Sequence, residues 1–203
     1  MQEQKAQQEL AFIKKVMEDS KNILVEDGKG FIFWGILITV GLVYSYFAVI
    51  SGGQKTLRWF WLALIAFGWL YTIIVETRQA KKRRISTFAG KIMGAIWISC
   101  GISMTLFGFI GPLAGAYSTI YINAALSFVL AIGYFVTGVV YRMKWITLLS
   151  IGWWAGGIVI FFWRDLSTLL VMAGMMIFFQ LIPGILLYKK YKKESAAVSD
   201  ERV

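Results

Sequence analysis

Residues 31–50 read FIFWGILITVGLVYSYFAVI, an apolar run that contains no Asp, Glu, Lys, Arg or His. A helix needs about 20 apolar residues to cross the roughly 30 Å hydrocarbon core of a bilayer. Five more runs of similar length and composition follow this one. The predicted membrane spans are residues 31–50, 57–75, 91–110, 118–141, 145–163 and 166–188.

The composition agrees with a membrane protein. The chain has 203 residues, of which 58% are hydrophobic, whereas soluble domains contain about 45–50% apolar residues. The runs are continuous and do not alternate between apolar and polar residues, which excludes a transmembrane β-barrel. We therefore predict an all-α polytopic membrane protein with six transmembrane helices. An even number of crossings places the two ends of the chain on the same side of the membrane.

The basic residues predict which side that is. Cytoplasmic loops carry an excess of Lys and Arg. On one side stand Arg78, Lys81, Lys82, Arg83, Arg84, Lys91, Arg142, Lys144, Lys189, Lys190, Lys192 and Lys193, whereas the other side has Lys55, Arg58 and Arg164. We expect both termini in the cytoplasm, with the chain in the cytoplasmic membrane. The net charge of +10 then reflects membrane orientation, with at most a weak attraction to anionic headgroups, and no nucleic-acid partner is expected.

The segment before the first span predicts an amphipathic helix in the cytoplasm. Residues 2–25 contain no Gly or Pro, and Leu10, Ile13, Met17 and Leu24 recur at helical spacing. Residues 1–30 show no apolar segment with a small-residue cleavage site, so the first span is expected to act as the insertion signal. The helix has three possible roles: it lies at the bilayer surface, packs beneath its own bundle, or pairs with a second copy or another membrane subunit. Residues 189–203 form a basic and then polar tail.

Paired glycines divide the six spans into three helical hairpins. The first helix of each hairpin contains such glycines, namely Gly35 and Gly41, then Gly94 and Gly101, then Gly152 with Gly156 and Gly157. The second helix of each hairpin ends in a small residue or Pro that is followed by basic residues. This pattern resembles the short-repeat membrane proteins related to the acid-resistance protein HdeD. The stretch LAFIKKVMEDS at residues 10–20 is similar to the start of small six-helix bacterial membrane proteins of unknown function. The resemblance implies six helices, cytoplasmic termini and a role in stress.

A few neutral polar residues lie within the predicted spans, where an unpaired amide or hydroxyl is costly. They are Ser99, Ser103, Asn123, Ser127 and Gln180. Ser99 and Ser103 share one helix face, as do Asn123 and Ser127, so the two central helices are able to present polar stripes to each other. One interpretation is hydrogen bonding between helices. The other is a narrow polar path or a site for a small solute, with Tyr121 and Tyr134 beside Asn123 and Gln180.

Three further residues are candidates for shaping the bundle. Gly152 and Gly156 form a small-xxx-small motif, which lets helix backbones approach closely. Pro183 lacks a backbone N–H and predicts a kink in the sixth span.

The residue inventory limits the chemistry. The chain has no His, and its single Cys, Cys100, lies within a span, so we expect no metal, no cofactor and no catalytic residue. The sequence predicts a non-enzymatic membrane protein with a structural or stress-related role. The alternatives are a small transporter or channel for a neutral solute and an accessory subunit of a membrane complex.

Overall fold

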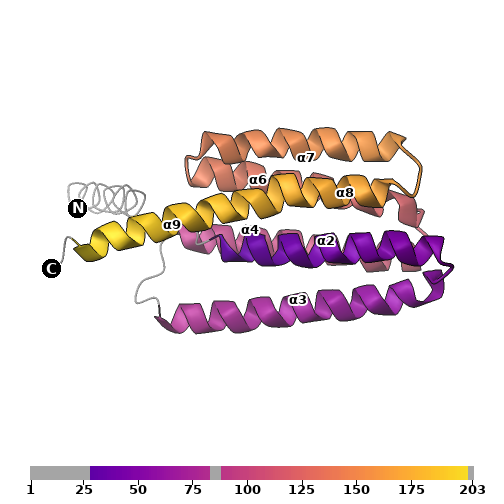
Figure 1. Ribbon diagram of the computed structural model, residues 1–203, viewed down its shortest axis with the longest axis horizontal. Coiled ribbons are helices and arrows are strands. Elements are labelled where there is room, and N and C mark those ends of the chain that lie inside the picture. Colours follow the sequence, from indigo (N-terminus) through magenta and orange to yellow (C-terminus); the bar gives the residue numbers. More distant parts are fainter. Residues whose placement is uncertain (1–27, 83–87, 201–203) are drawn as a thin grey trace, which may run out of the picture.

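The computed structural model describes residues 28–82 and 88–200. Within these residues six helices are long and apolar enough to span a membrane, which confirms the all-α, six-span prediction. The amphipathic helix predicted over residues 2–25 lies outside the described residues. The described spans lie side by side along one common direction, and successive spans run in opposite directions (Figure 1).

The six spans contain short π-helical and 3₁₀ segments as well as α-helix. The bounds are α2 (Lys29–Ile50); α3 (Gln54–Lys82); α4 (Phe88–Thr105), continued by η1 (Leu106–Ile110) and α5 (Gly111–Leu113); η2 (Thr119–Tyr121) with α6 (Ile122–Val140); α7 (Lys144–Phe162); and α8 (Thr168–Met176), continued by η3 (Ile177–Leu181) and α9 (Ile182–Asp200). Two helices extend beyond the predicted spans, α3 to Lys82 and α9 to Asp200. Good helix formers such as Glu, Lys and Ala continue these helices after the apolar run ends.

The turns between the spans contain backbone conformations that suit a reversal of chain direction. Gly52 (φ 77°) follows α2 and Gly115 (φ 66°) follows α5, both in the left-handed region that glycine adopts without steric cost. Arg142 (φ 52°) occupies the short turn between α6 and α7. At the start of α8, the Ser167 backbone N–H donates to an Asp165 carboxylate oxygen at 3.0 Å, whereas the Ser167 hydroxyl has no hydrogen-bond partner among the described residues.

The packing of the helices differs from three independent hairpins. The most extensive contact joins α6 and α7, which the sequence places in different hairpins. The first and last spans are also neighbours, because α2 packs along α8, η3 and α9 (Figure 1). Glycine spacing therefore did not predict which helices would pack most closely.

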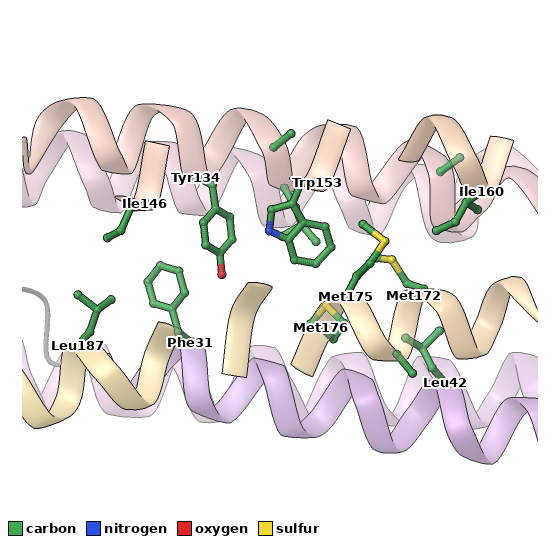
Figure 2. Packing of buried hydrophobic residues seen from close by; sticks show 14 residues of the cluster. Phe31, Leu42, Tyr134, Ile146, Trp153, Ile160, Met172, Met175, Met176 and Leu187 are labelled. Carbon is green, nitrogen blue, oxygen red and sulfur yellow. The ribbon is translucent and has the colours of Figure 1, made fainter. Parts of the chain in front are cut away.

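The apolar core lies between the α6–α7 pair, α2 and the last span. Its buried side chains include Tyr134, Trp153 and three methionines of the last span, and Figure 2 shows them filling the space between these helices. Among the side chains that the structure describes, α3 contributes no buried residue to this cluster, although its Trp61 packs against it. In an apolar stretch of 18 residues from the second span, which is α3, only 6% is buried, against 44% in the corresponding stretch of the span that contains α6. The fold is thus a packed core with a peripheral helix at its side.

Candidate functional site

Three of the predicted polar residues lie away from the core. Ser99 on α4 is exposed, and its hydroxyl donates to the carbonyl of Ala95 in its own helix at 2.8 Å. Ser103, one turn further along α4, and Asn123, at the start of α6, are half-buried. The structure does not bring Ser99 together with Gln180 or Ser127.

Ser127 is fully buried and binds to the neighbouring helix on the other side. Its hydroxyl donates to the backbone carbonyl of Trp153 on α7 at 2.6 Å. Ser127 is therefore bonded to α7 and not to the hydroxyls predicted on α4. The physical reason is that α6 packs most extensively against α7, so the buried face of α6 is the one that carries Ser127.

Gln180 does lie at the centre of the bundle. It is 5% exposed, and its side-chain Oε1 accepts a hydrogen bond from the hydroxyl of the fully buried Tyr134 at 3.3 Å. The bond joins α6 to the π-helical segment η3 of the last span. Tyr134 had been predicted only as a residue flanking a polar path, and the structure makes it the direct partner of Gln180.

Aromatic rings surround Tyr134. The ring centroids of Phe31, Trp97 and Trp153 lie 5.4, 5.8 and 5.8 Å from that of Tyr134, within the range of favourable aromatic pairs. The indole nitrogens of Trp97 and Trp153 are buried and have no hydrogen-bond partner among the described residues. This Tyr134 cluster offers neutral donors and an amide to a ligand, and no charged group.

Both prolines of the chain follow a π-helical turn at the same spacing. One residue separates the π-helical segment LFGFI (106–110) from Pro112, and one residue likewise separates IFFQL (177–181) from Pro183. Proline cannot donate to the carbonyl four residues earlier, and its ring collides with that carbonyl in a regular helix. A wider π-turn relieves this collision. In the first case, the hydroxyl of Tyr117 donates to the Phe107 carbonyl within the π-turn. The second π-turn carries Gln180 and holds it toward Tyr134.

Gly152 and Gly156 lie where α7 meets the last span. A Cβ on Gly152 would stand 2.8 Å from the ring of Phe179 in η3, and a Cβ on Gly156 would overlap the end of the Met175 side chain in α8. Because both positions lack a side chain, Phe179 and Met175 reach the surface of α7. Gly152 and Gly156 therefore lie at a contact between helices within the bundle.

The structure also contains a repeated contact that sequence reasoning missed. Three Trp indole nitrogens donate to a Ser or Thr hydroxyl on a neighbouring helix: Trp34 to Thr72 (3.1 Å), Trp61 to Ser45 (2.9 Å) and Trp69 to Thr105 (3.2 Å). We call these the three indole–hydroxyl bonds. Two join α2 and α3, and the third joins α3 and α4.

Each of these hydroxyls belongs to a Gly-x-x-x-Ser/Thr motif. The hydroxyls of Ser45, Thr72 and Thr105 donate to the carbonyls of Gly41, Gly68 and Gly101, one turn earlier, at 2.7–2.9 Å. The Trp ring that donates to each hydroxyl lies against the same glycine. A glycine four residues before a hydroxyl thus makes a flat surface for an indole and an acceptor for its N–H. This spacing is visible in the sequence, but Gly35 with Thr39 and Gly133 with Thr137 share it and receive no indole N–H among the described residues, so the spacing alone does not identify the contact.

Comparisons with known proteins give no further constraint. No protein-family model, no curated protein and no solved structure matches this chain significantly.

Proposed function

We propose that this chain is a non-enzymatic protein of the bacterial inner membrane with a structural or stress-related role. The observation that carries the proposal is that the buried polar residues are neutral and bonded within the protein, whereas the buried polar atoms without a partner among the described residues are the Trp97 and Trp153 indole nitrogens and the Ser167 hydroxyl. Among the described residues, the buried polar side chains are all neutral, namely Ser45, Ser127, Thr137, Ser150, Thr168 and Gln180. Each of them has a hydrogen-bond partner within the protein. Intramembrane sites for ions and protons normally use ionisable residues.

A stress-related role draws its support from the resemblance to the HdeD-related short-repeat proteins. That resemblance rests on glycine spacing and on the six-helix architecture. It suggests a protein that acts by its presence in the membrane and by its contacts there, without turnover of a substrate.

A flux assay tests the structural role. Purified protein in liposomes should leave the leakage of glycerol, urea and monovalent ions equal to that of protein-free liposomes. Solute flux that falls in Gln180→Leu, which removes the buried amide, and that persists in the matched variant Ser99→Ala, whose hydroxyl is exposed on α4, would contradict the structural role.

A small transporter or channel for a neutral solute is the second candidate. Its specific support is the Tyr134 cluster, in which a hydroxyl, an amide and two indole N–H groups without a protein acceptor gather in the bundle. Such groups recognise a solute that carries carbonyl or hydroxyl oxygens. On this interpretation Trp153→Phe, which removes one indole N–H, lowers the flux of such a solute severalfold and leaves ion leakage unchanged.

An accessory role in a membrane complex is the third candidate, and it depends on residues 2–25. Deletion of this segment would then abolish co-purification with a partner or with a second copy. Native mass spectrometry of the full chain and of the deletion variant in mild detergent reports both outcomes, together with bound lipid.

The proposed orientation places both termini in the cytoplasm. Its support is the group of exposed basic residues at the end of the bundle where α9 leaves it, among them Lys189 and Lys193 (Figure 1). In a Cys100→Ala background, Lys193→Cys should react with a membrane-impermeant maleimide only after the cells are opened, whereas Lys55→Cys should react in intact spheroplasts. The reverse pattern would overturn this orientation.

A further inference from the structure

The attachment of α3 to the rest of the molecule is unlike that of the other spans. Its large side chains point mostly away from the bundle, with Trp59, Phe67 and Leu70 exposed by 72%, 55% and 59%. In a bilayer these side chains meet lipid, which is as apolar as the side chains of another helix. Burial against the bundle therefore contributes less to the attachment of α3 than to that of the core helices.

In the part of the chain that the structure describes, the three indole–hydroxyl bonds are the side-chain hydrogen bonds that join α3 to α2 and α4. Helix association in lipid depends on van der Waals packing and interhelical hydrogen bonds, because the hydrophobic effect gives no preference for protein over lipid tails. At each site the indole packs on a glycine, so packing and hydrogen bonding occur at the same place. Two aromatic pairs also join α2 to α3, Phe33 with Tyr71 and Tyr44 with Phe60, at ring-centroid distances of 3.8 and 4.3 Å. The three sites and these pairs together hold α3 against its neighbours.

The geometry of the hydroxyls lets these bonds break at low cost. Ser45, Thr72 and Thr105 keep the hydrogen bonds to their own glycine carbonyls whether or not an indole is present. When α3 moves away, each hydroxyl proton stays satisfied, and only the indole N–H loses its partner. If both side chains depended on each other for their hydrogen bonds, separation of the helices would leave both without a partner.

The connection between α2 and α3 provides a hinge. It consists of Ser51, Gly52 and Gly53. Gly52 has φ 77°, and nothing lies within 4 Å of the position that a Cβ would occupy. Two consecutive glycines permit a wide range of backbone angles. Backbone hydrogen bonds hold this turn, from Gly52 to the Val49 carbonyl at 3.2 Å and from Gly53 to the Ala48 carbonyl at 2.7 Å, so a change in the angle between the two helices has to break or adjust them.

We propose that α3 is a hinged helix that swings away from α2 and α4 as one unit when the three indole–hydroxyl bonds break. The movement uncovers the surface of Gly41 and Ser45 on α2 and of Gly101 and Thr105 on α4, while the core of α2, α6, α7 and the last span stays closed. This inference stands apart from the roles proposed above, because it depends on the attachment of α3 alone.

Distance measurements by double electron–electron resonance in nanodiscs test this motion. In a Cys100→Ala background, spin labels at Leu70→Cys on α3 and Leu148→Cys on α7 report the position of α3. Labels at Ile36→Cys on α2 and Leu148→Cys report the core; all three positions are exposed. We expect a minor population with a longer α3–α7 distance, and a single α2–α7 distance.

Removal of the bonds should enlarge the open population. The triple variant Trp34→Phe/Trp61→Phe/Trp69→Phe is expected to raise the ratio of open to closed protein by roughly 20-fold, about threefold for each bond at the average strength of interhelical hydrogen bonds. The acceptor variant Ser45→Ala/Thr72→Val/Thr105→Val keeps all three indole rings and should shift the ratio in the same direction. It also tests the proposal if the Trp variant does not fold.

Two hydroxyls offer matched controls. Thr77 on α3 and Ser99 on α4 donate to carbonyls of their own helices and receive no indole N–H, so Thr77→Val and Ser99→Ala should leave both distances unchanged. An α3–α7 distance that stays at the wild-type value in the folded triple variants would overturn the proposal. Equal broadening of the α2–α7 distance would also overturn it, because the whole bundle would then loosen and α3 would not move by itself.

Discussion

The core formed by α2, α6, α7 and the last span differs from α3 in how it is held together. Between the core helices, bulky side chains such as Trp153 and Ile160 are almost completely buried, and glycines let α7 approach its neighbours. The α3 helix buries little and is joined to the bundle by indole N–H groups that bind hydroxyls. One region depends on close packing, and the other on a few directional bonds.

This difference has a physical basis in the bilayer. Lipid tails solvate apolar side chains as well as a protein interior does, so a helix gains stability from its neighbours only through close packing or hydrogen bonds. The core uses packing, which is difficult to undo in part because filled interiors tolerate few voids. The attachment of α3 depends more on separate hydrogen bonds, and α3 is released as one unit when all three indole–hydroxyl bonds are broken.

Truncation of a core indole should give the largest effect. Trp153 is 0% exposed and Trp59 on α3 is 72% exposed. We expect Trp153→Ala to lower the free energy of unfolding by roughly 3 kcal/mol, at the low end of Trp→Ala values in soluble cores, because helices that separate in the bilayer stay in lipid. Trp59→Ala should have little effect. Unfolding by SDS in mixed micelles measures both, and equal losses would remove the distinction between the regions.

A side chain added between α6 and α7 should be the next most damaging change. A Cβ on Gly138 would overlap the backbone nitrogen and the hydroxyl of Thr147 at the start of α7, and the backbone there has little freedom to move aside. Gly138→Ala should cost about 2 kcal/mol, within the range for overpacking. Gly174→Ala on α8 is the control, since nothing lies within 4 Å of its Cβ position. A fully stable Gly138→Ala variant in the same SDS assay would show that the two helices are less tightly fixed than we infer.

Loss of the central hydrogen bond should have a smaller effect. Tyr134→Phe keeps the ring in its aromatic surroundings and leaves Gln180 without the hydroxyl that it accepts from. The expected loss is about 1 kcal/mol, typical of a single buried hydrogen bond. Tyr44→Phe on the exposed face of α2 should be neutral. A Tyr134→Phe protein as stable as the wild type would show that the bond orients Gln180 without contributing stability.

The smallest expected effect is a pH dependence at the turn between α7 and α8. Hydrogen bonds from Ser167 and Leu166, among them the one from the Ser167 backbone N–H at 3.0 Å, lower the pKa of Asp165 below its ordinary value of 3.8. A lowered folded-state pKa stabilises the protein above pH 3.8, and this contribution disappears as the pH falls through the folded-state pKa. The stability of the wild type relative to Asp165→Asn should therefore decline below about pH 4. Parallel pH profiles of the two proteins would contradict this assignment.

The sequence predicted the spans because the physical rule involved is local. A run such as residues 31–50 is long and uncharged, and its length alone matches a bilayer. The packing partners were not predictable in the same way, since these helices are apolar on all sides and no stripe marks the face that meets protein. Glycine spacing suggested three hairpins, whereas α6 packs most extensively against α7.

The polar residues show the same limit. Gln180 was a candidate from its chemistry alone, but its partner Tyr134 depends on how α6 meets η3. Ser99 and Ser45 look equivalent as intramembrane hydroxyls. Ser45 accepts the indole N–H of Trp61, while Ser99 has Ala95 in place of a glycine one turn earlier and bonds only to its own helix. The Gly-x-x-x-Ser/Thr spacing could have been noticed, but which Trp reaches it is a property of the tertiary structure.

A double-mutant cycle on Trp61 and Ser45 tests most directly whether indole–hydroxyl bonds fasten α3 to the core. The cycle compares the unfolding free energies of the wild type, Trp61→Phe, Ser45→Ala and the double variant, and it isolates the coupling between the two side chains. Our account predicts a favourable coupling of about 0.6 kcal/mol and at most about 1.7, as found for other interhelical hydrogen bonds in membranes. Additive effects of the two substitutions, with zero coupling, would contradict it.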